Sequence, residues 1–185
     1  KDGVSFTAKL RAKTHGGSVS VSNEGLEVKN ANSVELYISA GTDFKLDNQE
    51  YKSLVDPLMA KAFATSYNQL KKEHIANYES LFNRVSVAIG NPDSKAADVQ
   101  HKLQLTTDER IRLFQIQDDP ALAALYMQYG RYLFISSTRP GTLPPNLQGL
   151  WANTISTPWN GDYHLNINIQ MNYWLMEPGN LADLY

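Results

Sequence analysis

Side chains suited to binding a sugar gather between Pro140 and Met176. In this stretch a single formal charge, Asp162, stands among amides and aromatic rings, and all three tryptophans of the chain fall here. The amide, aromatic and imidazole side chains are Trp151, Trp159, Trp174, Tyr163, Tyr173, His164, Asn146, Gln148, Asn153, Asn160, Asn166, Asn168, Gln170 and Asn172. Amides present a donor beside an acceptor, which matches neighbouring hydroxyls, and indole faces cover the apolar C–H face of a pyranose. The composition therefore predicts a carbohydrate site.

The distribution of charge argues against several other kinds of partner. A phosphate or nucleic-acid site needs Lys and Arg, and neither occurs between Pro140 and Tyr185. The formal net charge of −2 gives no broad basic field. No apolar run approaches the roughly 20 residues of a membrane-spanning helix. We therefore expect neither nucleic acid nor a membrane as a partner.

The same stretch lacks the residues of a metal centre. The chain has no cysteine, which removes disulfides, thiolate zinc sites and thiol nucleophiles. His164 has no second histidine, cysteine or carboxylate at a ligand spacing nearby. We predict no metal and no other cofactor.

The N-terminal part, 1–55, is predicted to be a sheet. Apolar residues alternate at Val19–Val28, Val34–Ile38 and Phe44–Leu46, and glycines and asparagines punctuate these runs. One sheet of a β-sandwich has no second layer against which to bury its apolar face. We therefore interpret 1–55 as the end of an N-terminal β-sandwich and expect further strands before Lys1.

Residues 56–105 are predicted to form a helical linker. Asp56 and Pro57 are typical of an N-cap and first helical position, and a second helix follows from Ser66. The alternation from Val85 to Gly90 predicts a short strand, and the turn residues 91–94 predict a loop.

Residues 106–185 are predicted to be helical. Thr106–Glu109 matches a capping box, and Asp119-Pro120 starts a helix that is apolar nearly all round and is expected to be buried on several sides. An uncharged loop then reaches Asp162, and the next helix is expected to carry Asn166 to Trp174 and to end at 177–179. An incomplete helix after Asn180 indicates that the chain is cut within a domain.

Three motifs in this region resemble glycoside hydrolase family 95, whose members are chiefly α-L-fucosidases. They are RYLFISS at 131–137, RPGTLPPNLQGLW at 139–151 and DYHLNINIQMNYW at 162–174, with a looser match at 74–85. The resemblance implies an N-terminal β-sandwich, a helical linker and an (α/α)6 catalytic barrel. This chain would hold the last strands of the sandwich, the linker and the opening of the barrel at 106–185.

The resemblance also implies an activity and residue roles. The family hydrolyses α-L-fucosidic bonds with inversion, and its general acid lies downstream of these motifs. Asn166 and Asn168 match its Asn-Ile-Asn element, in which the second asparagine positions the attacking water, and His164 matches a substrate-binding histidine near C5 of the sugar. The other predicted substrate contacts are Trp151, Trp159, Asn146, Gln148 and Glu177.

The family resemblance also implies the partners and the compartment. The expected substrate is a fucosylated glycan, with α-1,2-linkage to galactose, and the remainder of the same polypeptide is an expected partner. Family members that meet such glycans are commonly exported, so we expect a periplasmic or secreted bacterial protein.

The chemistry of an amide limits what Asn168 can do. Inverting hydrolysis needs an acid and a base about 6.5–9.5 Å apart, and an amide takes up no proton at ordinary pH. Asn168 can only orient the water while a carboxylate acts as the base. If that carboxylate lies beyond Tyr185, the 185 residues alone are expected to be inactive, and turnover by them would refute this.

Other interpretations stay open at this point. A member of the same family could act on L-galactose, although His164 argues against it. A carbohydrate-binding module would use the same aromatic and amide surface without cleavage, and a related phosphorylase would need a phosphate-binding group. Asp162 could be a catalytic acid or part of an Asn-Gly-Asp turn, and Trp174 is expected in the core.

Overall fold

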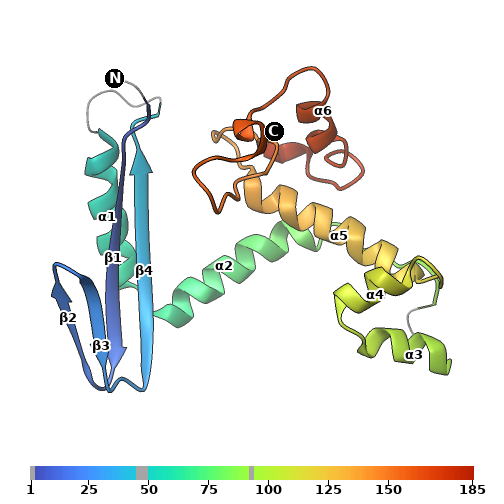
Figure 1. Ribbon diagram of the computed structural model, residues 1–185, viewed down its shortest axis with the longest axis horizontal. Helices are drawn as coiled ribbons and strands as arrows, with labels where there is room; N and C mark the ends of the chain where they lie inside the picture. Colours follow the sequence, from blue (N-terminus) through green and yellow to red (C-terminus); the bar gives the residue numbers. More distant parts are fainter. Residues whose placement is uncertain (1–2, 45–49, 92–93) are drawn as a thin grey trace. The chain divides into compact units, whose positions relative to one another are not determined.

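The structure, a computed structural model, describes residues 3–44, 50–91 and 94–185. The chain divides into two compact units, Lys1–Ile75 and Ala76–Tyr185 (Figure 1). The first contains all the described strands and the second most of the helices. The predicted boundaries after residues 55 and 105 stay predictions.

The first unit is built from four antiparallel strands. β1 (Phe6–His15) pairs with β4 (Ser33–Thr42), and β2 (Ser18–Ser22) pairs with β3 (Gly25–Lys29). The strands expected at 19–28 and 34–38 are confirmed. The strand expected at 44–46 is not: Phe44 lies in a turn, and Lys45 and Leu46 fall outside the described residues.

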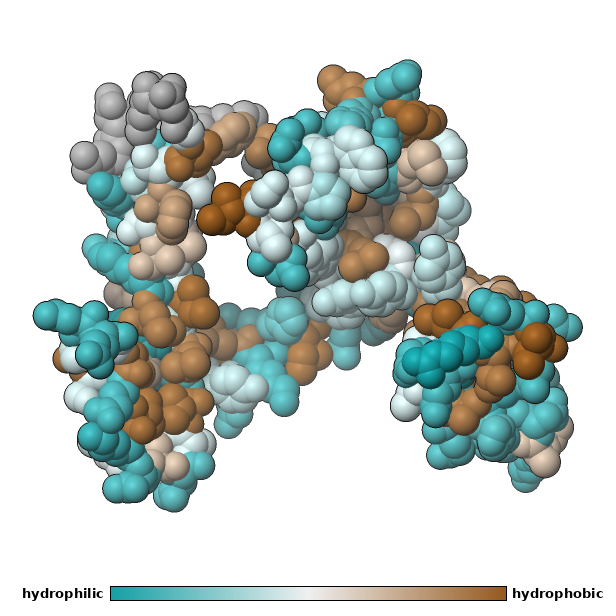
Figure 2. Space-filling view, in the orientation of Figure 1, coloured by the Kyte–Doolittle hydropathy of each residue, from teal (hydrophilic) through white to brown (hydrophobic). Residues whose placement is uncertain are grey.

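The β1–β4 pair is covered on one face and open on the other. Tyr37 is 7% exposed on the face that packs against α1 (Glu50–Ala64). On the opposite face Leu36 is 60% and Ile38 75% exposed, and Figure 2 shows hydrophobic side chains gathered over the strands. The described strands thus form two small antiparallel sheets, and the sandwich stays a prediction.

The start of α1 corrects the sequence prediction. The helix begins at Glu50, with Pro57 inside it, and not at Asp56-Pro57. Proline removes one intrahelical hydrogen bond. Tyr51, Val55 and Met59, spaced four residues apart, are buried on both sides of this point. Packing of this stripe on the sheet outweighs the loss, because tertiary burial dominates helix stability.

The segment after α1 contains one confirmed helix, one correction and one helix that the sequence did not reveal. α2 (Tyr67–Phe82) begins after Ser66, whose hydroxyl accepts from Gln69 N at 3.2 Å. Residues 85–90 form no strand, since the Val85 carbonyl accepts from Gln128 and Arg131 side chains and not from a neighbouring strand. α3 (Ala97–Gln104) was not predicted.

The helix starts expected in the second unit are confirmed. α4 (Thr107–Leu113) carries the capping box of Thr106 and Glu109. Asp119 is the N-cap of α5 (Pro120–Ser137), and its carboxylate accepts from Leu122 N at 3.0 Å. That carboxylate also pairs with Arg110 at 2.8 Å.

The burial of α5 agrees with the expectation in part. Phe134 and Ile135 belong to a core with Leu81, Leu181 and Leu184, whereas Tyr126 is 79% exposed on the opposite side. Leu122, Ala124 and Arg131 are buried as well, so α5 is buried on several sides but not all round. The described helices form no complete barrel.

The C-terminal segment holds short helices. They are the 3-10 turn η1 (Pro158–Gly161), α6 (Asn168–Tyr173) and the 3-10 turn η2 (Ala182–Leu184). α6 is shorter than predicted at both ends: Asn166 lies in the preceding turn, and the chain turns again after Tyr173. Within the described part of the chain, no helix is long and apolar enough to span a membrane.

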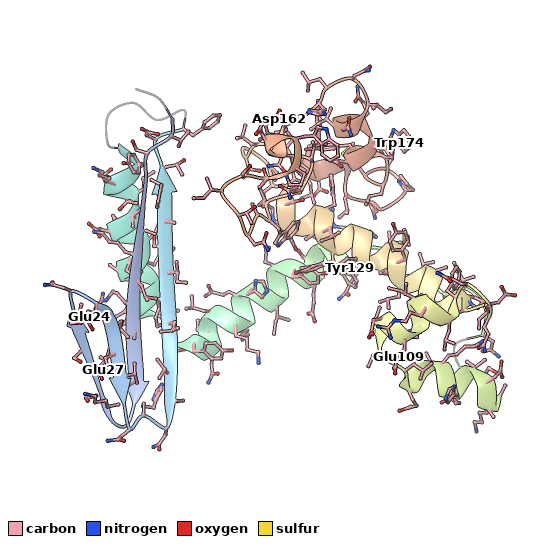
Figure 3. The ribbon with its side chains drawn as sticks, viewed as in Figure 1. Glu24, Glu27, Glu109, Tyr129, Asp162 and Trp174 are labelled. Atoms are coloured by element: carbon pink, nitrogen blue, oxygen red, sulfur yellow. The ribbon has the colours of Figure 1, made fainter. Side chains whose placement is uncertain are left out.

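Trp174 corrects a further expectation. It is 64% exposed and not in the core. Tyr173 takes the inward position instead, with its ring edge-on to Phe134 at 5.1 Å between centroids. Trp174 and Asp162 lie apart on this segment (Figure 3).

Candidate carbohydrate site

The loop at 145–149 is closed by its own backbone. Asn146 N donates to Gly149 O at 3.2 Å, and Gly149 N donates to Asn146 O at 3.0 Å. The Asn146 side chain accepts from Gln148 N at 2.8 Å, as in an Asx turn. Gly149 has φ +70, which glycine adopts without strain. The loop presents Gln148 on a fixed backbone.

A second turn presents Trp159. Trp159, Asn160 and Gly161 have φ values of 47, 55 and 61, all in the left-handed region. Non-glycine residues adopt this region rarely, and such strain gathers at functional sites. Asp162 N donates to Trp159 O at 3.0 Å, and Leu147 N donates to Asp162 O at 3.2 Å. The second bond joins the Trp159 turn to the Gln148 loop.

The entry to α6 presents His164 and Asn168. His164 has φ 43, and its carbonyl accepts from Ile169 N at 3.3 Å. Gln170 Nε2 donates to Leu165 O at 2.7 Å, which holds the turn that precedes the helix. Asn168 is the first residue of α6 and is half-buried.

These three elements enclose one cavity of about 490 Å³. Its lining residues are Leu147, Gln148, Pro158, Trp159, His164 and Asn168. The structure thus brings together Gln148, Trp159, His164 and Asn168, all predicted from the sequence as site residues. An indole, an imidazole and two amides can bind hydroxyls and cover a C–H face, which is what a neutral sugar requires.

Asp162 lies next to one of the residues that line this cavity. Its Oδ2 lies 3.8 Å from His164 Nε2, too far for a direct hydrogen bond but close enough for an electrostatic contact. No carboxylate is among the residues that line the cavity. In the described part of the chain, no group of three or more His, Cys, Asp or Glu could hold a metal ion.

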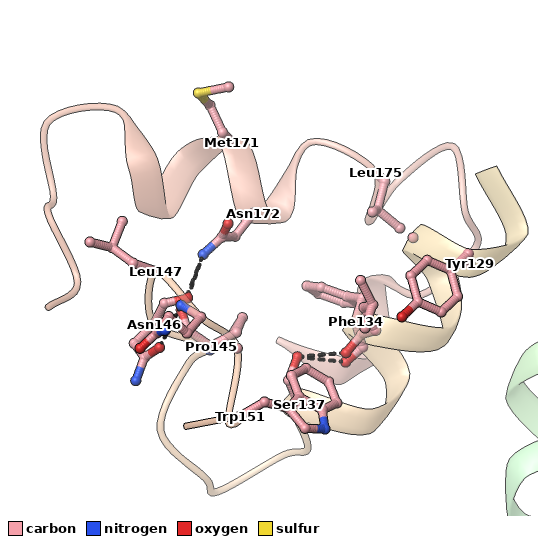
Figure 4. Close-up of a pocket in the computed structure, with 14 residues that line it drawn as sticks. Tyr129, Phe134, Ser137, Pro145, Asn146, Leu147, Trp151, Met171, Asn172 and Leu175 are labelled. Carbon is pink, nitrogen blue, oxygen red and sulfur yellow. Dashed lines mark hydrogen bonds between the residues drawn. The ribbon is translucent and has the colours of Figure 1, made fainter. Parts of the chain in front are cut away.

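The remaining predicted residues lie elsewhere. Asn146 and Trp151 line a neighbouring, mainly apolar cavity of about 550 Å³ that also shares Leu147 and Gln148 (Figure 4). Asn166 is exposed in the turn before α6, and Glu177 is exposed in the turn after it. Neither lines either of these cavities.

Sequence reasoning did not single out Asn172 as part of the site. Its Nδ2 donates to Pro145 O at 3.3 Å and Asn146 O at 3.2 Å (Figure 4). The available signal was its spacing, because residues four apart on a helix share a face and Asn172 follows Asn168 by four.

Comparisons with known proteins place the chain in a family. The catalytic domain of glycosyl hydrolase family 95 matches residues 66–185. Alpha-L-fucosidase 2 of Arabidopsis thaliana is 38% identical over 190 residues, which cover 98% of this chain and 22% of that protein. The probable alpha-fucosidase A of Aspergillus niger is 39% identical over 158 residues, and that of Aspergillus oryzae is 34% identical over 170 residues.

These matches cover most of this chain but only a small part of each relative. The two Aspergillus matches cover 85% and 86% of this chain but 18% and 23% of those proteins. The chain therefore spans about a fifth of the length of the curated relatives it matches. Because the catalytic-domain match covers more than half of the residues, this chain belongs to glycoside hydrolase family 95.

Proposed function

We propose that the chain is part of an enzyme that hydrolyses terminal α-L-fucose, α-1,2-linked to galactose, with inversion of the anomeric centre. The observation that carries this proposal is the convergence of Trp159, His164 and Asn168 on one cavity. Relatives named as α-fucosidases support it. Export of a bacterial protein stays a prediction from the family resemblance.

Each aromatic or polar side chain of the cavity has a role in this proposal. The Trp159 indole covers the C–H face of the fucose ring, and Gln148 exchanges hydrogen bonds with its hydroxyls. His164 lies beside C5, where it favours the methyl group of fucose over the hydroxymethyl group of L-galactose. Asn146, Trp151, Asn166 and Glu177 stay predicted contacts to the rest of the glycan or to the water.

Asn168 orients the nucleophile. Its carbonyl oxygen accepts one hydrogen of a water molecule, which leaves a lone pair of the water directed at the anomeric carbon. An amide takes up no proton, so a carboxylate base removes the second hydrogen. The leaving oxygen receives its proton from a carboxylic acid on the other side of the bond. Following the family resemblance, we assign both groups to the remainder of the polypeptide.

Proton NMR of the intact gene product tests this function. The protein is incubated with a fucosyl-α-1,2-galactose oligosaccharide, and the anomeric signal of the first sugar released is followed. β-L-Fucose is the expected product. α-L-Fucose as the first product would contradict inversion. Release of L-galactose from an α-L-galactoside, without release of fucose from the fucoside, would indicate an α-L-galactosidase. Binding of the oligosaccharide without release of a sugar would indicate a carbohydrate-binding protein.

A further inference from the structure

Asn172 joins the helix of the candidate site to the loop that faces it. The residue is half-buried on α6, one turn after Asn168. Its Nδ2 reaches two successive carbonyl oxygens, Pro145 O at 3.3 Å and Asn146 O at 3.2 Å (Figure 4). A single amide thus binds the loop at 145–149 at two points.

The loop is held from two sides. Leu147 N donates to Asp162 O, which ties the loop to the Trp159 turn, and Asn172 ties it to α6. The internal bonds between Asn146 and Gly149 keep the loop itself rigid. Loss of the Asn172 bonds would therefore let the loop shift as a unit relative to α6.

Such a shift would change the site because the loop carries Gln148. Gln148 and Asn168 line the same cavity, one from the loop and one from α6. Resting on the function proposed above, we propose that Asn172 is a positioning residue. It sets the placement of Gln148 relative to Asn168, and hence of the bound sugar relative to the attacking water.

The chemistry of the side chain decides which substitutions test this role. Two carbonyl oxygens need a donor, and an amide supplies two N–H groups. Asn172→Asp keeps the size of the side chain but replaces the donor by acceptors, and Asn172→Leu removes all polarity. Gln170→Leu is the matched control for the exchange of the loop only, because it removes a hydrogen bond made by the same helix to Leu165 O and none to the loop at 145–149.

The first measurement is a double-mutant cycle of kcat/KM in the intact gene product, with the fucosyl-α-1,2-galactose oligosaccharide as substrate. Asn172→Asp is expected to lower kcat/KM by about 10- to 100-fold, since small misplacements of positioned groups have effects of this size. In a Gln148→Leu background the same substitution is expected to lower it by less than about 3-fold, because residues that act through each other are non-additive. If Asn172→Asp lowered kcat/KM by the same factor in the wild type and in the Gln148→Leu protein, the inference would be overturned.

Hydrogen exchange of residues 146–149 provides a readout that does not depend on activity. All four amides of this loop are hydrogen-bonded, so their exchange reports loop opening. Exchange of these four amides is expected to accelerate about tenfold in Asn172→Asp and Asn172→Leu. In the same variants the exchange of α5 should not change, and in Gln170→Leu the exchange of the four loop amides should not change. Unchanged loop exchange would overturn the inference.

The two readouts separate this inference from the proposed function. A wild-type protein that releases no fucose would contradict the function, and loop exchange would still decide the role of Asn172. If the Asp variant fails to fold, the Leu variant carries the same test in both measurements.

Discussion

At the scale of single residues, the candidate site is made of side chains that can bind hydroxyls and cover a C–H face, without a carboxylate among them. The residues that line its cavity include two amides, an indole and an imidazole. In the proposed function the two amides and the indole bind and orient, and carboxylates outside this cavity supply the acid and the base. The consequence is that substitutions here should separate orientation of the water from proton transfer.

Asn168→Ala is expected to lower kcat about 100-fold with a small change in KM, because it removes the acceptor that orients the water and leaves sugar binding by Trp159 and Gln148 in place. Steady-state kinetics of the intact gene product measures both constants. Asn153→Ala, an exposed amide of the same segment outside the cavity, is the control. A rise in KM with unchanged kcat would show that Asn168 binds the sugar and does not act on the water.

Gly149 lies where a side chain would strike a tryptophan. A Cβ at this position would be 2.4 Å from Trp151 Cζ3, and φ is +70. Gly149→Ala is expected to displace the Trp151 ring and to alter tryptophan fluorescence. Gly141→Ala, at φ +82 with nothing within 4 Å, shares the backbone strain without the clash. Equal spectra for the two variants would contradict a clash at Trp151.

At the scale of elements, one arginine holds together the end of α2, the middle of α5 and the turn after α6. Arg131 is 0% exposed and donates to the carbonyl oxygens of Leu81, Phe82, Val85 and Gly179. Burial lowers the pKa of Arg131. The carbonyls at the end of α2 carry the negative end of the helix dipole, which favours a cation here.

Arg131→Met is expected to destabilise this junction by about 3 kcal/mol or more, since it leaves several carbonyl groups without donors in a buried place. Native-state hydrogen exchange of the α2 and α5 amides measures the change. Arg131→Lys keeps the charge but has fewer donors, so its exchange rates should lie between those of the wild type and of Arg131→Met. Exchange that is unchanged in the Met variant would mean that water replaces the arginine.

The start of α5 should respond to acid. Hydrogen bonds from Arg110 hold the pKa of the Asp119 carboxyl below its usual range, with a further contribution from Leu122 N. A carboxyl with a lowered pKa in the folded state stabilises that state above its ordinary pKa of about 3.9. The contribution is lost as the pH falls through the lower folded value.

Asp119→Asn isolates this charge, because asparagine also caps helices. The wild type is expected to protect the first turn of α5 more strongly at neutral pH, and the difference should shrink below about pH 4. Hydrogen exchange, corrected for its intrinsic pH dependence, measures the protection of this turn in the wild type and in Asp119→Asn. A difference that grows in acid would contradict the assigned sign.

At the scale of the whole molecule, the sheet has an uncovered apolar face. Phe6 is 77%, Leu36 60% and Ile38 75% exposed on this face of β1 and β4 (Figure 2). Apolar patches of this kind mark contact surfaces. The predicted β-sandwich would supply a second sheet as the partner of this face.

Leu36→Lys combined with Ile38→Lys is expected to have opposite effects in two proteins. In the isolated chain it should reduce binding of a hydrophobic dye, because the face is open to water. In the intact gene product it should lower the melting temperature, because charges would be buried against the second sheet. Leu54→Lys, at an exposed position of α1, is the control. An unchanged melting temperature would show that the face stays open.

The sequence alone determined the features that depend on near neighbours. The strand alternation at Val34–Ile38, the capping box at Thr106 and the N-cap at Asp119 need only residues a few positions apart, and the structure confirms them. The neutral, amide-rich composition of 140–176 likewise indicated a sugar site and four residues that share its cavity.

Only the tertiary structure decided which side chains converge and where marginal elements begin. α1 starts before Pro57 because the sheet buries Tyr51 and Val55, and residues 85–90 form no strand because side chains of α5 take the Val85 carbonyl. Asn146 braces its own loop while Gln148 lines the cavity. The outcomes at α1 and at 85–90 depend on burial and hydrogen bonds between separate segments of the chain, which local patterns do not encode.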